Sequence, residues 1–120
     1  MNLIELIGTE EATDYHQWDW RQAFIAAGLS LSKVVDVLAA SEGQNEGADW
    51  IAILKLTGGK FCYLAAGCDY TGWDSGCGGH YQVRGTLEDL IASTIPVDER
   101  HRLGIVVAFG RAVLNPRAAQ

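Results

Sequence analysis

The segment GCDYTGWDSGCGGH, residues 67–80, gathers side chains that could do chemistry. Cys77 and His80 are separated by two residues, which is the spacing of one arm of a small zinc site, and Cys68 precedes them in the same segment. Strong zinc signatures contain two tight pairs, whereas this segment contains one. Cys68, Cys77 and His80 are therefore candidate metal ligands, and zinc is the cofactor that they would hold. A fourth ligand would be Cys62, Asp69 or Asp74.

Two other kinds of chemistry use the same cysteines. A disulfide between Cys68 and Cys77 would contribute less than the ~3 kcal/mol of a loop of about 15 residues, and a reducing cytosol opposes it. A thiol enzyme would use one cysteine as nucleophile, His80 as base and Asp69 or Asp74 to orient the base. Because such partners usually converge from distant segments, their clustering in one loop does not favour catalysis.

A structural interpretation explains the segment more simply. Asp69 and Asp74 are suited to bonding the backbone N–H groups that follow them, and the glycines permit positive φ angles. Tyr70 and Trp73 would then cover the sheet, as in an Ω-like loop packed by its own side chains, or contact a partner. Cys62 is interpreted as a small core residue. This interpretation predicts no catalytic residue in the segment.

Charge is unevenly distributed along the chain. Residues 1–50 contain nine acidic and two basic side chains, whereas the other seventy contain six acidic and seven basic ones, and the net charge is −6. This distribution argues against binding to a phosphate backbone, which requires clustered Lys and Arg. It is compatible with a basic protein surface or with a solvated face that aids solubility. The candidate partner contacts in the acidic half are Glu10, Glu11, Asp14, Trp18 and Asp19.

The length and composition indicate one domain. A chain of 120 residues with 48% hydrophobic and 20% charged residues can bury a core without disulfides. No apolar run approaches the roughly 20 residues that span a bilayer, and the start MNLIELIGTEEATDYHQ does not match a signal peptide. We therefore expect a cytosolic protein. Its single domain, 1–120, would comprise an acidic helical part (1–45), a hairpin, loop and third strand (46–85), and helices with a tail (86–120).

Two helices are predicted in the acidic part. Asp14 and Gln17 form a capping box for a helix over 15–27, and Gly28 is placed to end it. The side of this helix that would face the core carries Trp20, Ala23, Phe24 and Ala27. A second helix is predicted over 31–41, because apolar residues recur there at helical spacing.

The rest of the chain predicts a small sheet and short helices. Strands over 50–57 and 60–66 would be joined by a two-residue Gly58-Gly59 loop, and a third strand would cover 80–85. Thr86 would cap a helix over 87–93, and 97–104 would form further helical turns. The tail from 105 is compatible with strand or helix. The predicted fold class is α+β, a small antiparallel sheet (hairpin plus third strand) packed with three to four helices on one side.

The motif AGCDYTGWD, preceded by an EG pair and a DW that enters the hairpin and followed by TLEDL, resembles a family of small uncharacterised proteins of phages, prophages and bacteria. The resemblance covers about 34–104. The family's loop ends in a second cysteine at the position of Ser75, whereas this chain has Cys77 two residues later, so the thiol spacing differs from the family pattern.

The resemblance brings no named activity but implies a setting. It implies a non-enzymatic accessory protein that binds a host protein, and small acidic proteins of this kind, among them anti-CRISPR proteins, often occupy surfaces meant for nucleic acid. The expected function is inhibition of a host nucleic-acid-handling or defence complex in the host cytosol, through an acidic face of the chain that contacts a basic surface of the host protein. Direct nucleic-acid or membrane binding is not expected. The alternative is a small zinc protein or thiol enzyme centred on Cys68, Cys77 and His80.

Overall fold

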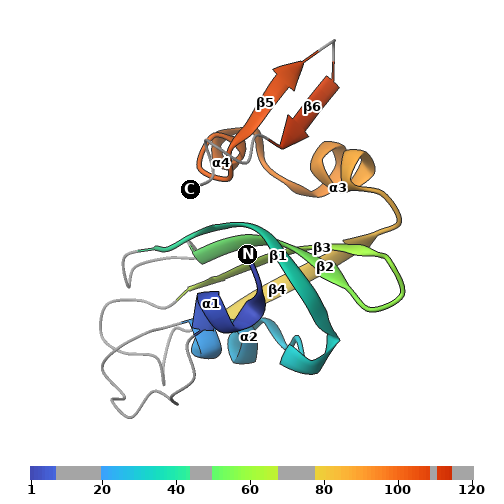
Figure 1. Cartoon of the computed structure of the whole chain (residues 1–120). Helices are drawn as coiled ribbons and strands as arrows, with labels where there is room; N and C mark the ends of the chain where they lie inside the picture. The colour runs from blue at the N-terminus through green and yellow to red at the C-terminus, as the bar shows by residue number, and fades with distance from the viewer. Residues whose placement is uncertain (8–19, 44–49, 68–77, 109–110, 115–120) are drawn as a thin grey trace.

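A computed structural model describes residues 1–7, 20–43, 50–67, 78–108 and 111–114 of the chain. They form a four-stranded antiparallel sheet, a separate two-stranded hairpin and short helices, so the α+β class is confirmed (Figure 1). The four strands lie side by side in chain order. They are β1 (Val34–Ser41), β2 (Trp50–Leu56), β3 (Phe61–Gly67) and β4 (Gly78–Arg84), and the hairpin is β5 (Ile105–Ala108) with β6 (Arg111–Leu114).

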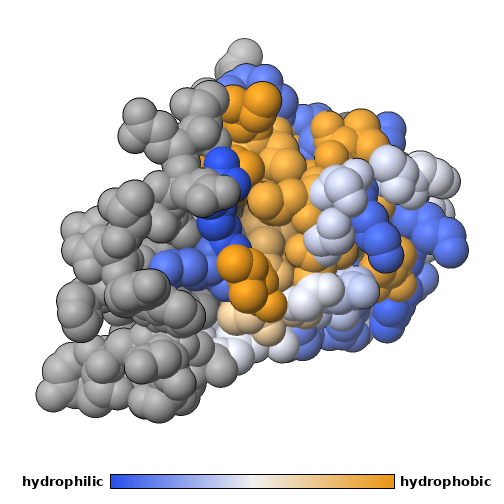
Figure 2. All heavy atoms as spheres, turned by 90° about the horizontal axis from the view of Figure 1, so that it is seen from below, coloured by the Kyte–Doolittle hydropathy of each residue, from blue (hydrophilic) through white to orange (hydrophobic). Residues whose placement is uncertain are grey.

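The helices are short and lie on both sides of the sheet. They are α1 (Leu3–Ile7), α2 (Trp20–Ala27), the 3₁₀ turn η1 (Leu31–Lys33), α3 (Leu87–Thr94) and α4 (Val97–Arg100). In the described ranges, no helix has the length and apolar character needed to cross a membrane. Figure 2 shows the side formed by α1 and α2, where apolar side chains lie among hydrophilic ones.

Helix α2 has the predicted buried side and the predicted end. Its four expected core residues are all buried. Gly28 adopts a φ of 80°, and its N–H and that of Leu29 both donate to the Phe24 carbonyl, at 3.0 and 3.1 Å. This bonding satisfies a carbonyl that the helix end would leave unpaired. The predicted capping box of Asp14 and Gln17 lies outside the described residues.

The predicted helix over 31–41 is wrong, because this segment forms η1 and then strand β1. The apolar residues of this segment do not alternate as in a regular strand, because β1 pairs irregularly with β2. The register shifts twice, between Val34 and Asp36 and between Val37 and Ala39. Each shift changes which side chains face a given side of the sheet, so the regular alternation that identifies a strand is lost. β-branched valines favour the extended conformation that results.

The hairpin of β2 and β3 is confirmed, with a longer loop than predicted. The strands remain in register as far as Lys55 opposite Phe61, and the Leu56 N–H donates to the Lys60 carbonyl at 2.8 Å. Thr57 therefore belongs to the loop together with the two glycines. Gly58 and Gly59 have φ angles of 89° and 80°, which glycine adopts without steric cost.

The later elements largely follow the prediction. The third strand begins two residues earlier than expected, at Gly78. Thr86 caps α3 by accepting a hydrogen bond from the Asp89 N–H at 3.1 Å. Gly104 closes the turns after α4 with a φ of 75°. The tail, for which strand and helix were both open, forms β5 and β6.

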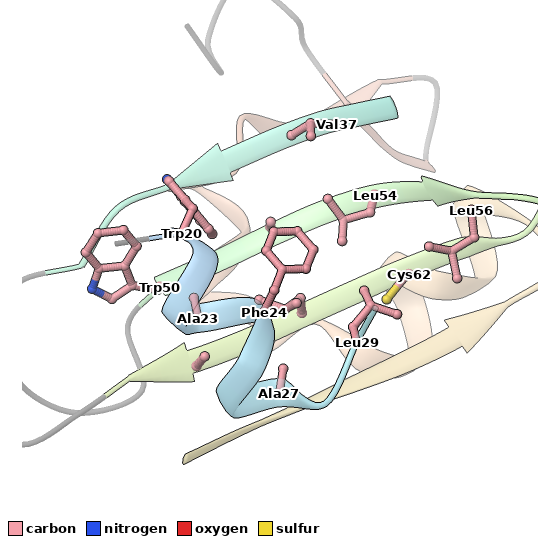
Figure 3. Packing of buried hydrophobic residues seen from close by; sticks show 13 residues of the cluster. Trp20, Ala23, Phe24, Ala27, Leu29, Val37, Trp50, Leu54, Leu56 and Cys62 are labelled. Carbon is pink, nitrogen blue, oxygen red and sulfur yellow. The ribbon is translucent and has the colours of Figure 1, made fainter. Parts of the chain in front are cut away.

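The helices pack on both faces of the sheet, which corrects the expectation of one covered face. The α2-side core contains Trp20, Ala23, Phe24, Ala27, Leu29, Val37, Trp50, Ala52, Leu54, Leu56, Cys62, Leu64 and Ala66 (Figure 3). The α3-side core contains Ala39, Ile51, Ile53, Tyr63, Ala65, Leu90, Ile91, Ile95, Leu103 and Ile105. Alternate residues of β2 enter opposite cores, which explains why its sequence WIAIL is apolar without alternation.

Candidate functional site

Most of the predicted site residues lie in segments outside the described residues. Of the candidate partner contacts and metal ligands, the structure gives the positions of His80 and of Cys62, one of the candidate fourth ligands. The others fall within 8–19 and 68–77. They are Glu10, Glu11, Asp14, Trp18, Asp19, Cys68, Asp69, Tyr70, Trp73, Asp74 and Cys77.

The structure does show where these segments attach to the fold. Ser41 at the end of β1 pairs with Ile51 of β2, and Gly67 at the end of β3 pairs with Gly78 of β4. Segment 44–49, which joins β1 to β2, and segment 68–77, which joins β3 to β4, therefore begin and end at the same end of the sheet (Figure 1). Segment 8–19 leads into α2 at Trp20. We call this end, where Ser41, Trp50, Gly67 and Gly78 lie, the loop end of the sheet.

An aromatic pair brings α2 to the loop end. The Trp20 ring meets the Trp50 ring edge-on, with ring centroids 5.1 Å apart and an interplanar angle of 76°. Both side chains are buried, and among the described residues neither indole Nε1 has a hydrogen-bond partner. Such edge-to-face pairs contribute about 0.5–1.5 kcal/mol beyond area burial. The three connections 8–19, 44–49 and 68–77 therefore all join the described fold at its loop end.

At the loop end, β4 lies so close to β3 that residue 79 has no room for a side chain. A Cβ atom at Gly79 would lie 2.8 Å from the Ala65 carbonyl oxygen and 2.8 Å from the Ala66 Cβ. Real Cβ atoms do not approach other atoms so closely, so this position requires glycine. At least one glycine of the GCGGH sequence thus has a packing role in the sheet.

His80 lies beside a buried tyrosine on the α3 side of the sheet. The His80 side chain is exposed, and its ring centroid is 6.2 Å from that of Tyr63, at an interplanar angle of 69°. The Tyr63 hydroxyl donates a hydrogen bond to the Glu99 carboxylate. Burial, then the bond to Glu99 and its negative charge, raise the pKa of Tyr63 above its usual value. Tyr63 is therefore a neutral hydrogen-bond donor and is unsuited to act as a general base near neutral pH.

Arg102 links the segment after α4 to the end of β1. Its Nε and Nη2 atoms lie 3.2 and 3.0 Å from the Ser41 Oγ, and Nη2 lies 3.5 Å from the Glu42 carbonyl. Together with the bond from Tyr63 to Glu99, this contact ties the α4 region to the sheet. The arrangement supplies rigidity next to the loop end and places no nucleophile beside a base.

Two further arginines also serve the fold. Arg100 donates from Nε to the Ile95 carbonyl at 3.0 Å and from Nη2 to the Ile91 carbonyl at 3.1 Å. Arg84 donates from Nε to the Ser93 Oγ at 3.1 Å. These guanidinium groups satisfy carbonyls and hydroxyls of their own chain, which limits what they offer to a phosphate.

Cys62 is a core residue, as the structural interpretation predicted. Its side chain is fully buried in the α2-side core. Burial raises the pKa of Cys62 to about 12, so the thiol stays protonated at neutral pH and is a poor nucleophile. Within the described part of the chain, no three His, Cys, Asp or Glu side chains gather as a metal site.

Sequence reasoning missed the long-range contacts that tie α4 and the turn after it to the sheet. Tyr63 and Glu99 are 36 residues apart, and Ser41 and Arg102 are 61 apart, so no local spacing connects them. The one available signal was Tyr63 itself, a tyrosine within an apolar strand, because a buried phenol needs a hydrogen-bond acceptor.

The chain was compared with known proteins in three ways. A scan against protein-family models, a search of curated proteins and a search of solved structures each found no match. These comparisons therefore contribute no family and no function to the argument.

Proposed function

We propose that the chain is a non-enzymatic binding protein of phage or prophage origin that acts in the host cytosol. It contacts a basic surface of a host protein through the acidic connections at the loop end of the sheet. By occupying that surface it inhibits a nucleic-acid-handling or defence complex, in the manner of an anti-CRISPR protein. The phage setting comes from the motif resemblance, and the mode of contact comes from the distribution of charge.

One observation carries the proposal. The three connections that attach at the loop end, 8–19, 44–49 and 68–77, contain eight of the 15 acidic residues of the chain and none of its nine Lys and Arg. More than half of the acidic side chains of the chain thus belong to connections that join the described fold at its loop end. These residues are Glu10, Glu11, Asp14, Asp19, Glu46, Asp49, Asp69 and Asp74.

Negative charge concentrated at one end attracts a basic surface before the two proteins touch. A patch of one sign creates a potential that steers a complementary surface and raises the association rate, and its effect weakens as salt increases. Arg102, which contacts Ser41, brings one positive charge beside the loop end, whereas Arg84 and Arg100 bond within the α3 side of the fold. Trp18, Tyr70 and Trp73 belong to the same connections, and aromatic side chains commonly anchor protein interfaces.

Charge reversal tests the proposed surface. The variant Glu10→Lys/Glu11→Lys/Asp14→Lys/Asp19→Lys should bind the host partner at least about tenfold more weakly, mainly through slower association, and should lose the salt dependence of binding. The partner is captured from host lysate with the wild-type protein and identified by mass spectrometry. Its Kd for each variant is then measured at several salt concentrations.

A matched pair of variants controls for net charge. Glu10→Lys/Glu11→Lys and Glu88→Lys/Asp98→Lys change the net charge equally, but Glu88 and Asp98 are exposed on α3 and α4 rather than in the acidic connections. We expect only the first pair to weaken binding. Equal effects of the two pairs, or a Kd and salt dependence that survive the fourfold reversal, would refute the proposed surface.

Metal analysis separates this function from the alternative of a zinc protein. We expect the purified and dialysed protein to contain less than about 0.1 zinc per chain, because a structural zinc site would require all of its ligands to be deprotonated and correctly spaced. Elemental analysis of wild type and of Cys77→Ser/His80→Ala makes the measurement. A stoichiometric zinc that survives dialysis and disappears in the double variant would replace the proposed structural role of 68–77 with a metal site.

A further inference from the structure

Strand β4 forms an edge of the sheet and is regularly built. It pairs with β3 through seven successive residue pairs without a register shift. Among the described residues, no other segment pairs with its outer side. His80 and Tyr81, near the middle of the strand, are exposed. β4 therefore presents a regular row of backbone N–H and C=O groups along the edge of the sheet.

The opposite edge, β1, is protected in two ways for which the described residues show no counterpart at β4. Its pairing with β2 contains two register shifts, and irregular edges are poor templates for another strand. Met1 also covers it, because the Met1 amino group donates to the Val37 carbonyl at 2.7 Å and the Val37 N–H donates to the Met1 carbonyl at 2.8 Å. β4 contains no proline, lysine or bulge. The two edges are thus not equivalent.

The hydrogen-bonding pattern identifies which groups of β4 point outward. The bond between Leu56 and Lys60 fixes the alternation of the β2–β3 ladder, because residues that bond to one neighbour alternate with residues that bond to the other. Continued through β3, this alternation directs every second residue of β4 away from the sheet. The outward N–H and C=O groups belong to Gly79, Tyr81 and Val83. The Val83 carbonyl already accepts a hydrogen bond from Arg84 Nη1 at 2.8 Å, and its second lone pair is available to a further donor.

We propose that two copies of the chain associate through this edge, with their β4 strands antiparallel about a two-fold axis at Tyr81. Tyr81 is the middle residue of Gly78–Arg84, so the outward groups are arranged symmetrically about it. The two four-stranded sheets then form one continuous sheet across the axis. The register pairs Tyr81 with Tyr81, Val83 with Gly79, Gln82 with His80 and Arg84 with Gly78 of the second copy.

Charge and side-chain size favour a second copy as the occupant. β4 carries no carboxylate in a chain with a net charge of −6, so two acidic molecules can approach here without like charges meeting. The two Arg84 residues lie at opposite ends of the paired strands, about 20 Å apart at the rise of an extended chain. Val83 and Arg84 each face a glycine, and the central pair is aromatic, which is a favourable cross-strand combination.

The oligomeric state tests the pairing. Sedimentation equilibrium of the wild-type chain should show a monomer–dimer equilibrium, and Tyr81→Lys should weaken dimerisation at least about tenfold, because two ammonium groups then meet at the axis. Val35→Lys is the matched control, since Val35 is 54% exposed on the other edge strand. Its dimer should be as stable as that of the wild type. A wild-type chain that stays monomeric throughout, or a Tyr81→Lys dimer of unchanged stability, refutes the proposal.

Crosslinking tests the register and does not depend on how Tyr81→Lys folds. In a chain with Cys68→Ser and Cys77→Ser, Tyr81→Cys should form an intermolecular disulfide on oxidation, because opposed residues of a hydrogen-bonded pair have Cα atoms about 5.5 Å apart. Val35→Cys in the same background should crosslink at least about tenfold more slowly. Equal rates for the two variants contradict pairing at Tyr81.

The inference is independent of the proposed function, because it makes no use of the acidic connections.

Discussion

Raising the pH above about 9 should destabilise the folded protein steeply. The pKa of Cys62 is raised from 9.0 to about 12 by burial, and the pKa of Tyr63 is raised above its usual 10.0 by burial and by Glu99. Below pH 9 both groups are protonated in the folded and unfolded states, so the folded state retains its full stability. Between pH 9 and 12 the unfolded chain releases the Cys62 proton while the folded chain holds it, which favours unfolding.

The expected size of this effect is large compared with typical protein stability. Each such group lowers the free energy of unfolding by about 1.4 kcal/mol per pH unit, so Cys62 alone removes ~4 kcal/mol by pH 12. Tyr63 adds a similar slope above pH 10. Because domains of this size are stable by about 5–15 kcal/mol, a combined loss of ~7 kcal/mol by pH 12 removes about half or more of that stability. Urea denaturation followed by circular dichroism at successive pH values measures the slope.

Two variants assign the alkaline slope to the buried groups. Cys62→Ala/Tyr63→Phe should flatten the dependence between pH 9 and 12, although its stability at pH 7 will be lower. Tyr81→Phe removes a phenol that is 37% exposed, and it should leave the slope as in the wild type. A wild-type free energy of unfolding that stays constant from pH 8 to 11 would show that these two groups are not held protonated by burial.

Phe24→Ala should cost about 3–5 kcal/mol of stability, the usual loss for a buried aromatic side chain. Phe24 is 1% exposed and lies in the α2-side core against β2 and β3 (Figure 3). Helix α2 has eight residues, too few to be stable without its packing, so the loss should also release the helix from the sheet.

The next residue of the same helix is the control. Ile25 is 78% exposed, and Ile25→Ala should change the free energy of unfolding by less than about 0.5 kcal/mol. Urea denaturation of both variants at pH 7 makes the comparison. If Phe24→Ala cost no more than Ile25→Ala, α2 would not be packed on the sheet as described.

The elements predicted correctly from the sequence are those fixed by local chemistry. Gly28 and Gly104 end helical segments with positive φ angles, and Thr86 caps α3 through its own side chain. The hairpin between β2 and β3 likewise depends on neighbouring glycines. In each case, the residues that determine the structure lie within a few positions of it, so a sequence pattern is enough to find it.

The errors arise where distant contacts decide the structure. Segment 34–41 is a strand because β2 lies beside it, and its two register shifts remove the alternation that would identify it. The run WIAIL gave no sign that its alternate side chains enter two different cores. For the candidate site, the acidic excess was visible in the sequence, but its attachment to one end of the sheet follows from strand pairing and from the contact of Trp20 with Trp50.

The simple order of the four strands also has a consequence for the folding of the chain. Each strand pairs with the strand that precedes or follows it in the sequence, so the sheet forms through short loop closures. Such local pairings lower the contact order, and proteins of low contact order fold fast. The contacts of Arg102 with Ser41 span 61 residues and should form late. During synthesis, the sheet can therefore assemble from the N-terminal side before α3, α4 and the final hairpin close its second face.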